Sequence, residues 1–257
     1  MQPTTWQIEQ YPEVDSTNRL AREYARAGVP GRCAIVADLQ TAGRGRMGRQ
    51  WAMPAGAGLM VSLLLRPDLL AEAAYQLTML AAVATSEAIE ATAGIPVAIK
   101  WPNDLLLAHG GRLRKASGIL AEVDIDHRHR RLRWAVLGIG VNLTWHPTGV
   151  IDGRDLSERT TSLAAAGGAV TATTRDALLA ALLQRVDHWC SLLTPQGSPP
   201  LQDAWQQRLA LLGSEVAVQL PSQLLHGIAE GVDRQGALLL RTADGQLHTI
   251  TAGDVLA

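Results

Sequence analysis

Residues 41–51 read Thr41-Ala42-Gly43-Arg44-Gly45-Arg46-Met47-Gly48-Arg49-Gln50-Trp51, a run in which three glycines are interspersed with three arginines. It connects two apolar stretches, 33–38 and 59–65, that have the composition of buried β-strands. Glycine allows a backbone to approach a ligand closely, and each guanidinium offers a planar fork of donors to a carboxylate or a phosphate. The stretch therefore predicts two strands joined by an anion-binding loop.

Two common phosphate-binding motifs do not explain this loop. Gly43, Gly45 and Gly48 spell G-x-G-x-x-G, but a dinucleotide-binding fold needs a helix directly afterwards and an acidic residue about 20 positions further on. Residues 50–58 instead contain proline and glycine, and the acid at that distance, Asp68, stands in a turn. A P-loop is excluded because neither lysine of the chain follows a glycine.

The rest of the pattern predicts an α+β fold, with a mixed β-sheet flanked by helices. Capping residues at 15–18 and Gly28 bound a first helix, and Thr173 with Asp176 is typical of a capping box. Further helices are expected at 71–93, 173–193 and 201–212, and further strands at 97–101, 105–107, 117–124 and 133–138.

The last part of the chain changes character after Gly213. Short apolar runs at 216–218, 224–228, 237–240 and 247–250 are separated by glycines, which is typical of a small β-barrel. The sequence thus predicts a catalytic domain over residues 1–212 and a small SH3-like β-barrel over 213–257.

Composition limits the partners. The chain has 257 residues with 23 basic and 24 acidic side chains, so no overall field attracts it to DNA or to an anionic membrane. The apolar run at 58–65 is far too short to span a bilayer, and the first residues do not resemble a signal peptide. Neither Cys33 nor Cys190 stands in a metal or disulfide pattern, so both are expected to be buried and reduced. A cytoplasmic protein is expected.

Lysine is scarce in this chain. Only Lys100 and Lys115 are lysines, and arginine supplies the other basic side chains. A compact ammonium and a planar guanidinium are not interchangeable where carboxylate or phosphate is bound, so these two positions are candidate functional residues. The alternative is chance in a chain whose composition favours arginine.

Four motifs together resemble those of the biotin protein ligase family, the biotin–[acetyl-CoA-carboxylase] ligases. They occur in the family's order and, with the C-terminal barrel, cover nearly the whole chain. The motifs are Asp15-Ser16-Thr17-Asn18; Gln40 with Gly43 to Trp51; Lys100-Trp101-Pro102-Asn103-Asp104; and Arg114 to Leu120 with Gly138-Ile139-Gly140-Val141-Asn142. Since only 14 residues precede the first motif, the resemblance implies the monofunctional form, without the DNA-binding domain of bifunctional members.

The resemblance implies an activity. Biotin and ATP are the expected substrates, Mg²⁺ the expected metal ion, and biotinyl-5′-AMP the expected intermediate. Biotin then passes to a lysine of a biotin carboxyl carrier protein. No DNA or membrane partner is expected, and a homodimer is possible.

The resemblance also implies the site residues. The expected catalytic residues are Lys115, Arg44, Arg46 and Asp104. Expected biotin contacts are Ser16, Thr17, Asn18, Gln40, Gly43, Arg44, Gly45, Arg46, Lys115 and Gly118. Expected ATP or adenylate contacts are Arg46, Arg49, Trp51, Lys100, Asn103 and Asn142, and Asn103 and Asp104 are the candidate Mg²⁺ ligands.

Several of these positions have a structural alternative. Ser16 or Thr17 is equally suited to cap a helix, Trp51 to anchor the core, and Asn142 to cap a turn. Lys100 is either a phosphate contact or structural. Asp104 and Asn103 are suited to orienting Lys115, holding Mg²⁺ or receiving a proton, or to forming a plain turn.

Two other functions remain open from the sequence. A lipoate or octanoate ligase or transferase of the same broad fold would accept an apolar chain with no ureido ring. A non-catalytic, biotin-responsive regulator would act through protein or DNA contacts, which the near-zero net charge disfavours.

Overall fold

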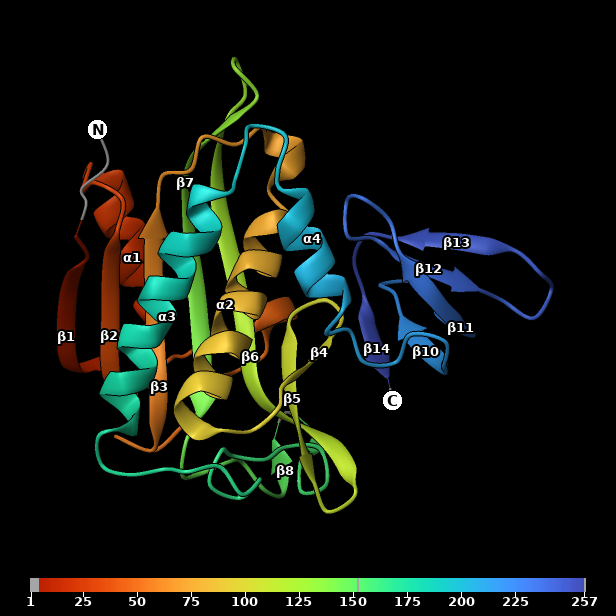
Figure 1. Cartoon of the computed structure of the whole chain (residues 1–257), viewed down its shortest axis with the longest axis horizontal. Coiled ribbons are helices and arrows are strands. Elements are labelled where there is room, and N and C mark those ends of the chain that lie inside the picture. The colour runs from red at the N-terminus through yellow and green to blue at the C-terminus, as the bar shows by residue number, and fades with distance from the viewer. Residues whose placement is uncertain (1–4, 152, 257) are drawn as a thin grey trace.

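A seven-stranded mixed sheet forms the centre of the molecule in the computed structural model, which describes residues 5–151 and 153–256 (Figure 1). The strand order is β1-β2-β3-β7-β6-β5-β4; β1 and β2 are parallel and the other neighbours antiparallel. The strands are β1 (Gln7–Val14), β2 (Cys33–Gln40), β3 (Gly58–Leu65), β4 (Ala98–Lys100), β5 (Asp104–His109), β6 (Arg112–Asp126) and β7 (Arg131–Asn142). The prediction of an α+β fold with a mixed sheet is confirmed.

Helices cover both faces of this sheet. The helices α2 (Gln76–Ala93), α3 (Thr174–Ser191) and α4 (Pro199–Gln206) lie on one face, with short 3₁₀ turns at Arg46–Gly48 and Ala71–Ala73 in the connections (Figure 1). Helix α1 (Thr17–Arg26) packs on the other face. Because alternate strand residues point to opposite faces, Ala34 of β2 joins the larger core while Ile35 packs against α1. Strand β3 is buried along its whole length because helices cover both faces of the sheet.

The C-terminal segment forms a separate five-stranded antiparallel sheet beside α4 (Figure 1). Its strands are β10 (Glu215–Gln219), β11 (Leu224–Val232), β12 (Leu238–Arg241), β13 (Leu247–Ile250) and β14 (Asp254–Leu256), in the order β13-β12-β11-β10-β14. The sheet does not close into the expected barrel, since β13 and β14 are its two edges among the described strands. The Trp101 indole joins it to the larger sheet by donating to the Gly236 carbonyl at 2.9 Å.

Several predicted elements differ from those observed. The capping box at Thr173 is wrong: Thr173 has helical backbone angles and no side-chain cap, and the Thr174 hydroxyl instead accepts from the Thr171 amide at 2.8 Å. The helix expected at 201–212 ends at Gln206. Strands β1 and β14 were not anticipated, and a short pair, β8 (Val150–Ile151) with β9 (Arg154–Asp155), was also missed.

The two cysteines are free, as expected, but only Cys33 is buried. Burial raises the pKa of the Cys33 thiol to about 11. Cys190 keeps some exposed surface, which differs from the expectation, although burial is still the main reason that the pKa of its thiol rises to about 12. Residues 1–4, which bear on the expected lack of a signal peptide, lie outside the described part. Over the described helices, none is both long and apolar enough to cross a membrane.

The larger core predicts where stability resides. Leu80 on α2 is fully buried between the sheet and the neighbouring helices, so Leu80→Ala is expected to lower the free energy of unfolding by about 2–5 kcal/mol through lost packing and a residual cavity. Leu192, which is 39% exposed, is the control, and its change to alanine should cost less than about 1 kcal/mol. Urea unfolding of both variants measures this, and equal midpoints would contradict it.

Candidate active site

The glycine–arginine loop folds into a tight hairpin over the sheet. The Gly45 amide donates to the Arg49 carbonyl at 2.7 Å, and the Trp51 amide donates to the Gly43 carbonyl at 3.0 Å. Met47 and Gly48, with φ of 55° and 75°, turn the chain between these bonds. The loop is thus held by its own backbone and presents its three arginines from a fixed frame.

Trp51 lies flat on strands β6 and β7 because those strands carry glycine beneath it. A methyl group at Gly140 would come within 2.3 Å of the indole ring, and one at Gly118 within 3.0 Å. Only glycine therefore leaves room for the ring at Gly140. The indole closes one side of the cavity described next.

A small cavity of about 90 Å³ lies under the loop. It contains most of the site residues predicted from the sequence, namely Ser16, Thr17, Asn18, Gln40, Arg44, Gly45, Arg46, Arg49, Trp51, Asn103, Asp104, Lys115 and Gly118. Its lining also includes Gln50, Ile119, Leu120, Gly138, Ile139 and Gly140, to which the sequence gave no role. Gly43, Lys100 and Asn142 do not line it.

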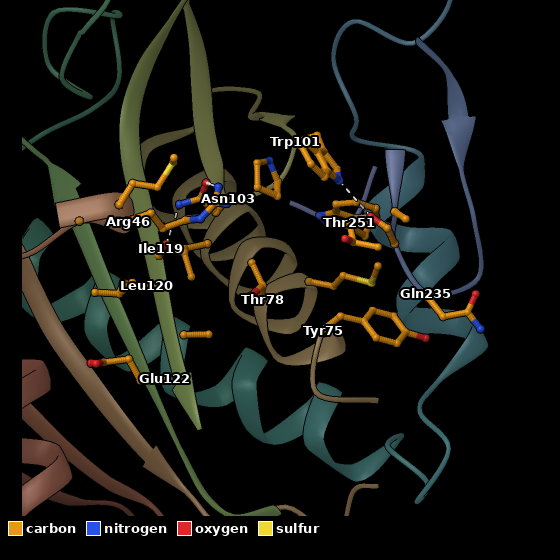
Figure 2. Close-up of a pocket in the computed structure, with 18 of the residues that line it drawn as sticks. Arg46, Tyr75, Thr78, Trp101, Asn103, Ile119, Leu120, Glu122, Gln235 and Thr251 are labelled. Carbon is orange, nitrogen blue, oxygen red and sulfur yellow. Dashed lines mark hydrogen bonds between the residues drawn. The ribbon is translucent and has the colours of Figure 1, made fainter. Parts of the chain in front are cut away.

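A larger cavity of about 600 Å³ adjoins the small one and reaches to the C-terminal sheet (Figure 2). The two share Arg44, Gly45, Arg46, Asn103, Ile119 and Leu120 in their linings. Its other walls include aromatic and thioether side chains from Tyr75, Met79, Trp101 and Trp205, together with small and polar residues. Figure 2 shows Arg46 and Asn103 together at one end, with Tyr75 and Gln235 towards the other. The sequence gave no sign of this cavity, because its walls come from distant segments.

Lys115 and Asp104 meet in the lining of the small cavity. The Lys115 ammonium lies 2.6 Å from the Asp104 carboxylate, and both side chains are partly buried. It also lies 5.6 Å from the centre of the Trp51 ring, within the range of a cation–π contact. The sequence predicted each residue, and the structure places them together.

A β-bulge brings the Lys115 and Asp104 side chains together. In the pairing of β5 with β6, Leu105 is opposite Ser117 and Leu106 is opposite Lys115, so Ala116 is an extra residue. Such a bulge re-aims the side chains next to it. The Lys115 ammonium comes to lie over Gly118, where an added Cβ would be 3.2 Å from it, and Gly118 is the register partner of Asp104.

The three loop arginines each have a partner. Arg44 forms an ion pair with Glu122 at 3.1 Å, and the Arg46 guanidinium donates to the Asn103 carboxamide oxygen at 2.9 Å. Burial lowers the pKa of Arg46, an effect that the Asp104 carboxylate opposes.

Asp254 connects the loop to the C-terminal sheet. Its carboxylate forms an ion pair with Arg49 and lies 3.9 Å from Arg46, and the Gly253 carbonyl accepts from Arg46 at 3.5 Å. Asp254 was missed in the sequence because a single acid in a short apolar strand carries no motif. The segment 253–254 thus holds two arginines of a loop some 200 residues earlier in the chain.

Neutral polar groups gather at the other end of the small cavity. The Gln40 carboxamide oxygen accepts from the Thr17 amide at 2.8 Å and from the Thr17 hydroxyl at 3.1 Å. Asn18 donates to the Leu120 carbonyl at 3.2 Å and to the Glu122 carboxylate at 2.9 Å. Ser16 caps helix α1 by accepting from the Arg19 amide, which is the structural role that the sequence offered as an alternative. Ser16 also lines the cavity.

Two predicted ligand contacts occupy structural positions. The Asn142 carboxamide is buried at the end of β7 and donates to the Thr161 carbonyl at 2.9 Å, a bond between distant segments and not a turn cap. Lys100 ends strand β4 outside both cavity linings; burial lowers its pKa, and the nearby Asp104 carboxylate opposes that shift.

The candidate Mg²⁺ ligands are already engaged. The Asn103 oxygen accepts from Arg46 and the Asp104 carboxylate faces Lys115, while no group of three His, Cys, Asp or Glu side chains that could hold a metal occurs among the described residues. Mg²⁺ prefers oxygen ligands with near-octahedral geometry. Since Mg²⁺ is usually held by one or two carboxylates together with substrate phosphates, Asn103 and Asp104 as its ligands stay a prediction.

Comparisons with known proteins identify the family of the chain. A model of the biotin/lipoate A/B protein ligase family matches residues 11–142, and a model of the biotin protein ligase C-terminal domain matches residues 211–256. The chain is 37% identical to the biotin–[acetyl-CoA-carboxylase] ligase of Paracoccus denitrificans, over 94% of this chain and 96% of that one. It is 36% identical to the bifunctional ligase/repressor BirA of Bacillus subtilis, over 94% of this chain and 71% of that one.

The fold also has solved counterparts. The biotin protein ligase from Aquifex aeolicus in complex with biotin and ATP superposes with a TM-score of 0.77. The two chains are 27% identical, and the match covers 97% of each.

The contact of Asp254 with Arg49 predicts an effect on the KM for ATP. Because the carboxylate holds both arginines expected to meet ATP phosphates, Asp254→Asn should raise the KM for ATP about tenfold while leaving the Kd for biotin unchanged. The control is Glu230→Gln, which breaks an exposed Arg241 pair in the same sheet. ATP kinetics and biotin titration test this, and a KM for ATP that matches the control variant would contradict it.

Proposed function

This chain belongs to the biotin/lipoate A/B protein ligase family, and we propose that it is an ATP-dependent ligase that attaches biotin to a lysine of a biotin carboxyl carrier protein. The observation that carries the proposal is the Lys115–Asp104 pair under Trp51, in a cavity with a neutral hydrogen-bonding end and an arginine-rich end. A neutral ureido head group and an anionic tail suit these two ends.

The first half-reaction brings two anions together. The carboxylate of biotin attacks the α-phosphorus of ATP, the bond to the β-phosphate breaks, and pyrophosphate leaves with biotinyl-5′-AMP formed. Two unit charges about 4 Å apart repel by about 4 kcal/mol at an effective dielectric constant near 20, so positioned cations are needed. We assign this role to Lys115, with Arg46 and Arg49 on the phosphates.

Asp104 positions the lysine. A carboxylate 2.6 Å away holds the Lys115 ammonium at the cavity, and the Trp51 ring, 5.6 Å from the ammonium, restricts it further. In the second half-reaction the lysine amine of the carrier attacks the acyl carbon and AMP leaves. Asp104 is then the carboxylate nearest to receive the proton of that amine.

The larger cavity is our candidate entrance for the carrier lysine. It adjoins the small cavity at Arg46 and Asn103, and aromatic and thioether walls such as Met79 and Trp101 suit the four-carbon stem of a lysine. The Arg44–Trp51 segment lines the small cavity, where it is placed to shield a mixed anhydride from water.

Other expectations remain proposals. We retain residues 1–212 as the catalytic domain and 213–257 as the smaller one, with the latter assisting through Asp254. Mg²⁺ as a requirement, the homodimer and the cytoplasmic location stay predictions, and no step above runs through a metal. A lipoate or octanoate substrate is disfavoured because neither offers partners for Thr17 and Gln40.

Pyrophosphate exchange into ATP tests the function. Purified protein should exchange label between pyrophosphate and ATP when biotin is present, because adenylation is reversible. Lipoate and octanoate should support less than about 1% of that exchange, since they leave buried polar groups unpaired. Exchange that depends on lipoate or octanoate would assign the chain to the other branch, and no exchange with any acid would refute ligation.

Lys115→Arg tests the central assignment. A guanidinium is broader than an ammonium and directs its donors in one plane, so exchange should fall at least about 100-fold although the charge is kept. Lys100→Arg is the matched control, since Lys100 lies outside both cavities, and should retain most of the exchange. Near-normal exchange by the Lys115 variant would remove its catalytic role.

A further inference from the structure

A serine hydroxyl lies behind the neutral end of the small cavity and has not been given a role. Ser62 is fully buried in β3, a strand that is otherwise apolar after its first glycine. Its hydroxyl donates towards the Asn18 carboxamide oxygen at 2.5 Å and the Thr17 hydroxyl oxygen at 2.8 Å. A serine has one hydroxyl hydrogen, so this hydrogen lies between two acceptors.

The orientation of Gln40 follows from a backbone contact. Its carboxamide oxygen accepts from the Thr17 amide, which can only donate, so the oxygen must face Thr17. The Thr17 hydroxyl donates to that same oxygen. The Gln40 amide nitrogen therefore points the other way, to the Met60 sulfur at 3.3 Å, which is a weak acceptor.

These contacts set the donor-to-acceptor direction along the series Ser62, Thr17 and Gln40. The Ser62 hydrogen is shared between Asn18 and Thr17, and Thr17 donates to Gln40, so the only hydroxyl hydrogen of Thr17 is already used. Thr17 and Gln40 both line the small cavity. A ligand there meets a lone pair on Thr17 beside the amide hydrogens of Gln40, which is an acceptor next to a donor.

We propose that Ser62 is a positioning residue that sets this polarity and thereby makes the cavity select a head group with an N–H beside a carbonyl, the edge of a cyclic urea. This inference rests on the proposed function and deepens it, because it names what distinguishes biotin from other carboxylic acids. Ser62 does not line the cavity, so it acts through Thr17 and Asn18.

Selection depends on the cost of binding a mismatched head group as well as on the hydrogen bonds made by a matching one. A head group that presents an oxygen in place of the N–H would set one lone pair against another at Thr17, in a site where Thr17 is only 4% exposed. Unpaired buried acceptors discriminate strongly between ligands that differ by one hydrogen. Without Ser62, the Thr17 hydroxyl gains a second rotamer and can donate to such an oxygen.

The test compares biotin with its two cyclic carbamate analogues, in each of which one ureido N–H is replaced by a ring oxygen of similar size. Titration calorimetry gives the Kd of each ligand for the wild-type protein, Ser62→Ala and Ser86→Ala. Ser86 is the matched control, because it is equally buried but donates to the Ala82 carbonyl on α2.

We expect the wild-type protein and Ser86→Ala to bind one carbamate isomer at least about 100-fold more weakly than biotin, and Ser62→Ala to reduce this ratio to about tenfold. A Ser62 variant that weakens all three ligands equally, or keeps the wild-type ratio, would overturn the proposal. If Ser62→Ala does not fold, Ser62→Cys, a weaker donor, should give an intermediate ratio, and a wild-type ratio below about threefold for both isomers overturns the proposal without any variant.

The outcomes distinguish the proposed function from the role of Ser62. A wild-type protein that does not bind biotin refutes the proposed function. A wild-type protein that binds biotin but treats the carbamates alike refutes only the role of Ser62.

Discussion

Lys115 reaches Asp104 because one extra residue, Ala116, interrupts the pairing of β5 with β6. In a regular ladder the side chains alternate strictly between the two faces, and a one-residue shift moves every later side chain to the other face. The bulge uses that shift to bring the ammonium over Gly118. Much of the site then depends on the ammonium's position, since the indole of Trp51 lies 5.6 Å from it and the loop arginines line the same cavity.

The arginine loop is a set of paired charges. Arg44 is paired with Glu122, Arg46 is bonded to Asn103, and Arg49 is paired with Asp254. Binding of an anion is therefore an exchange of partners, in which a phosphate or carboxylate replaces an acid or amide. Such an exchange gains less than capture by an unpaired cation would, but the guanidiniums are held in place beforehand, so less side-chain entropy is lost. Because Asp254 belongs to the C-terminal sheet, an anion that displaced it from Arg49 would also alter the contact between the loop and that sheet.

The elements that the sequence predicted are those with strong local signals. Ser16 and Gly28 bound a helix because capping is a local interaction, and 59–65 was recognised because β3 is buried on both faces. Strand β1 was missed because its Gln, Glu and Pro residues lack an apolar pattern, and pairing with β2 makes it a strand. Thr173 failed as a cap because Thr174 bonds the preceding turn instead.

The candidate site likewise contains residues that the sequence predicted and residues that it missed. Lys115, Asp104 and the loop arginines came from motifs, and the structure gathers them around one cavity. Ser62, Glu122 and Asp254 could not be found, because a hydroxyl or carboxylate becomes informative only through the partner that it meets, and these partners lie 44 to 205 positions away. The larger cavity is invisible in the sequence for the same reason, since it exists only where the C-terminal sheet meets the central one.

The separation of charge within the small cavity gives a bound ligand its orientation. Thr17, Gln40 and Ser62 are neutral, whereas Lys115, Arg46 and Arg49 carry the positive charge. Glu122 lies at the boundary, where it accepts from Asn18 on one side and pairs with Arg44 on the other. Because the Glu122 carboxylate is paired with both Arg22 and Arg44, its charge is balanced, and a molecule with a neutral head and a carboxylate tail is matched best with its tail at the cationic end. With a net charge of −1 over the whole chain, an attraction for an anion depends on this local arrangement and not on the overall field.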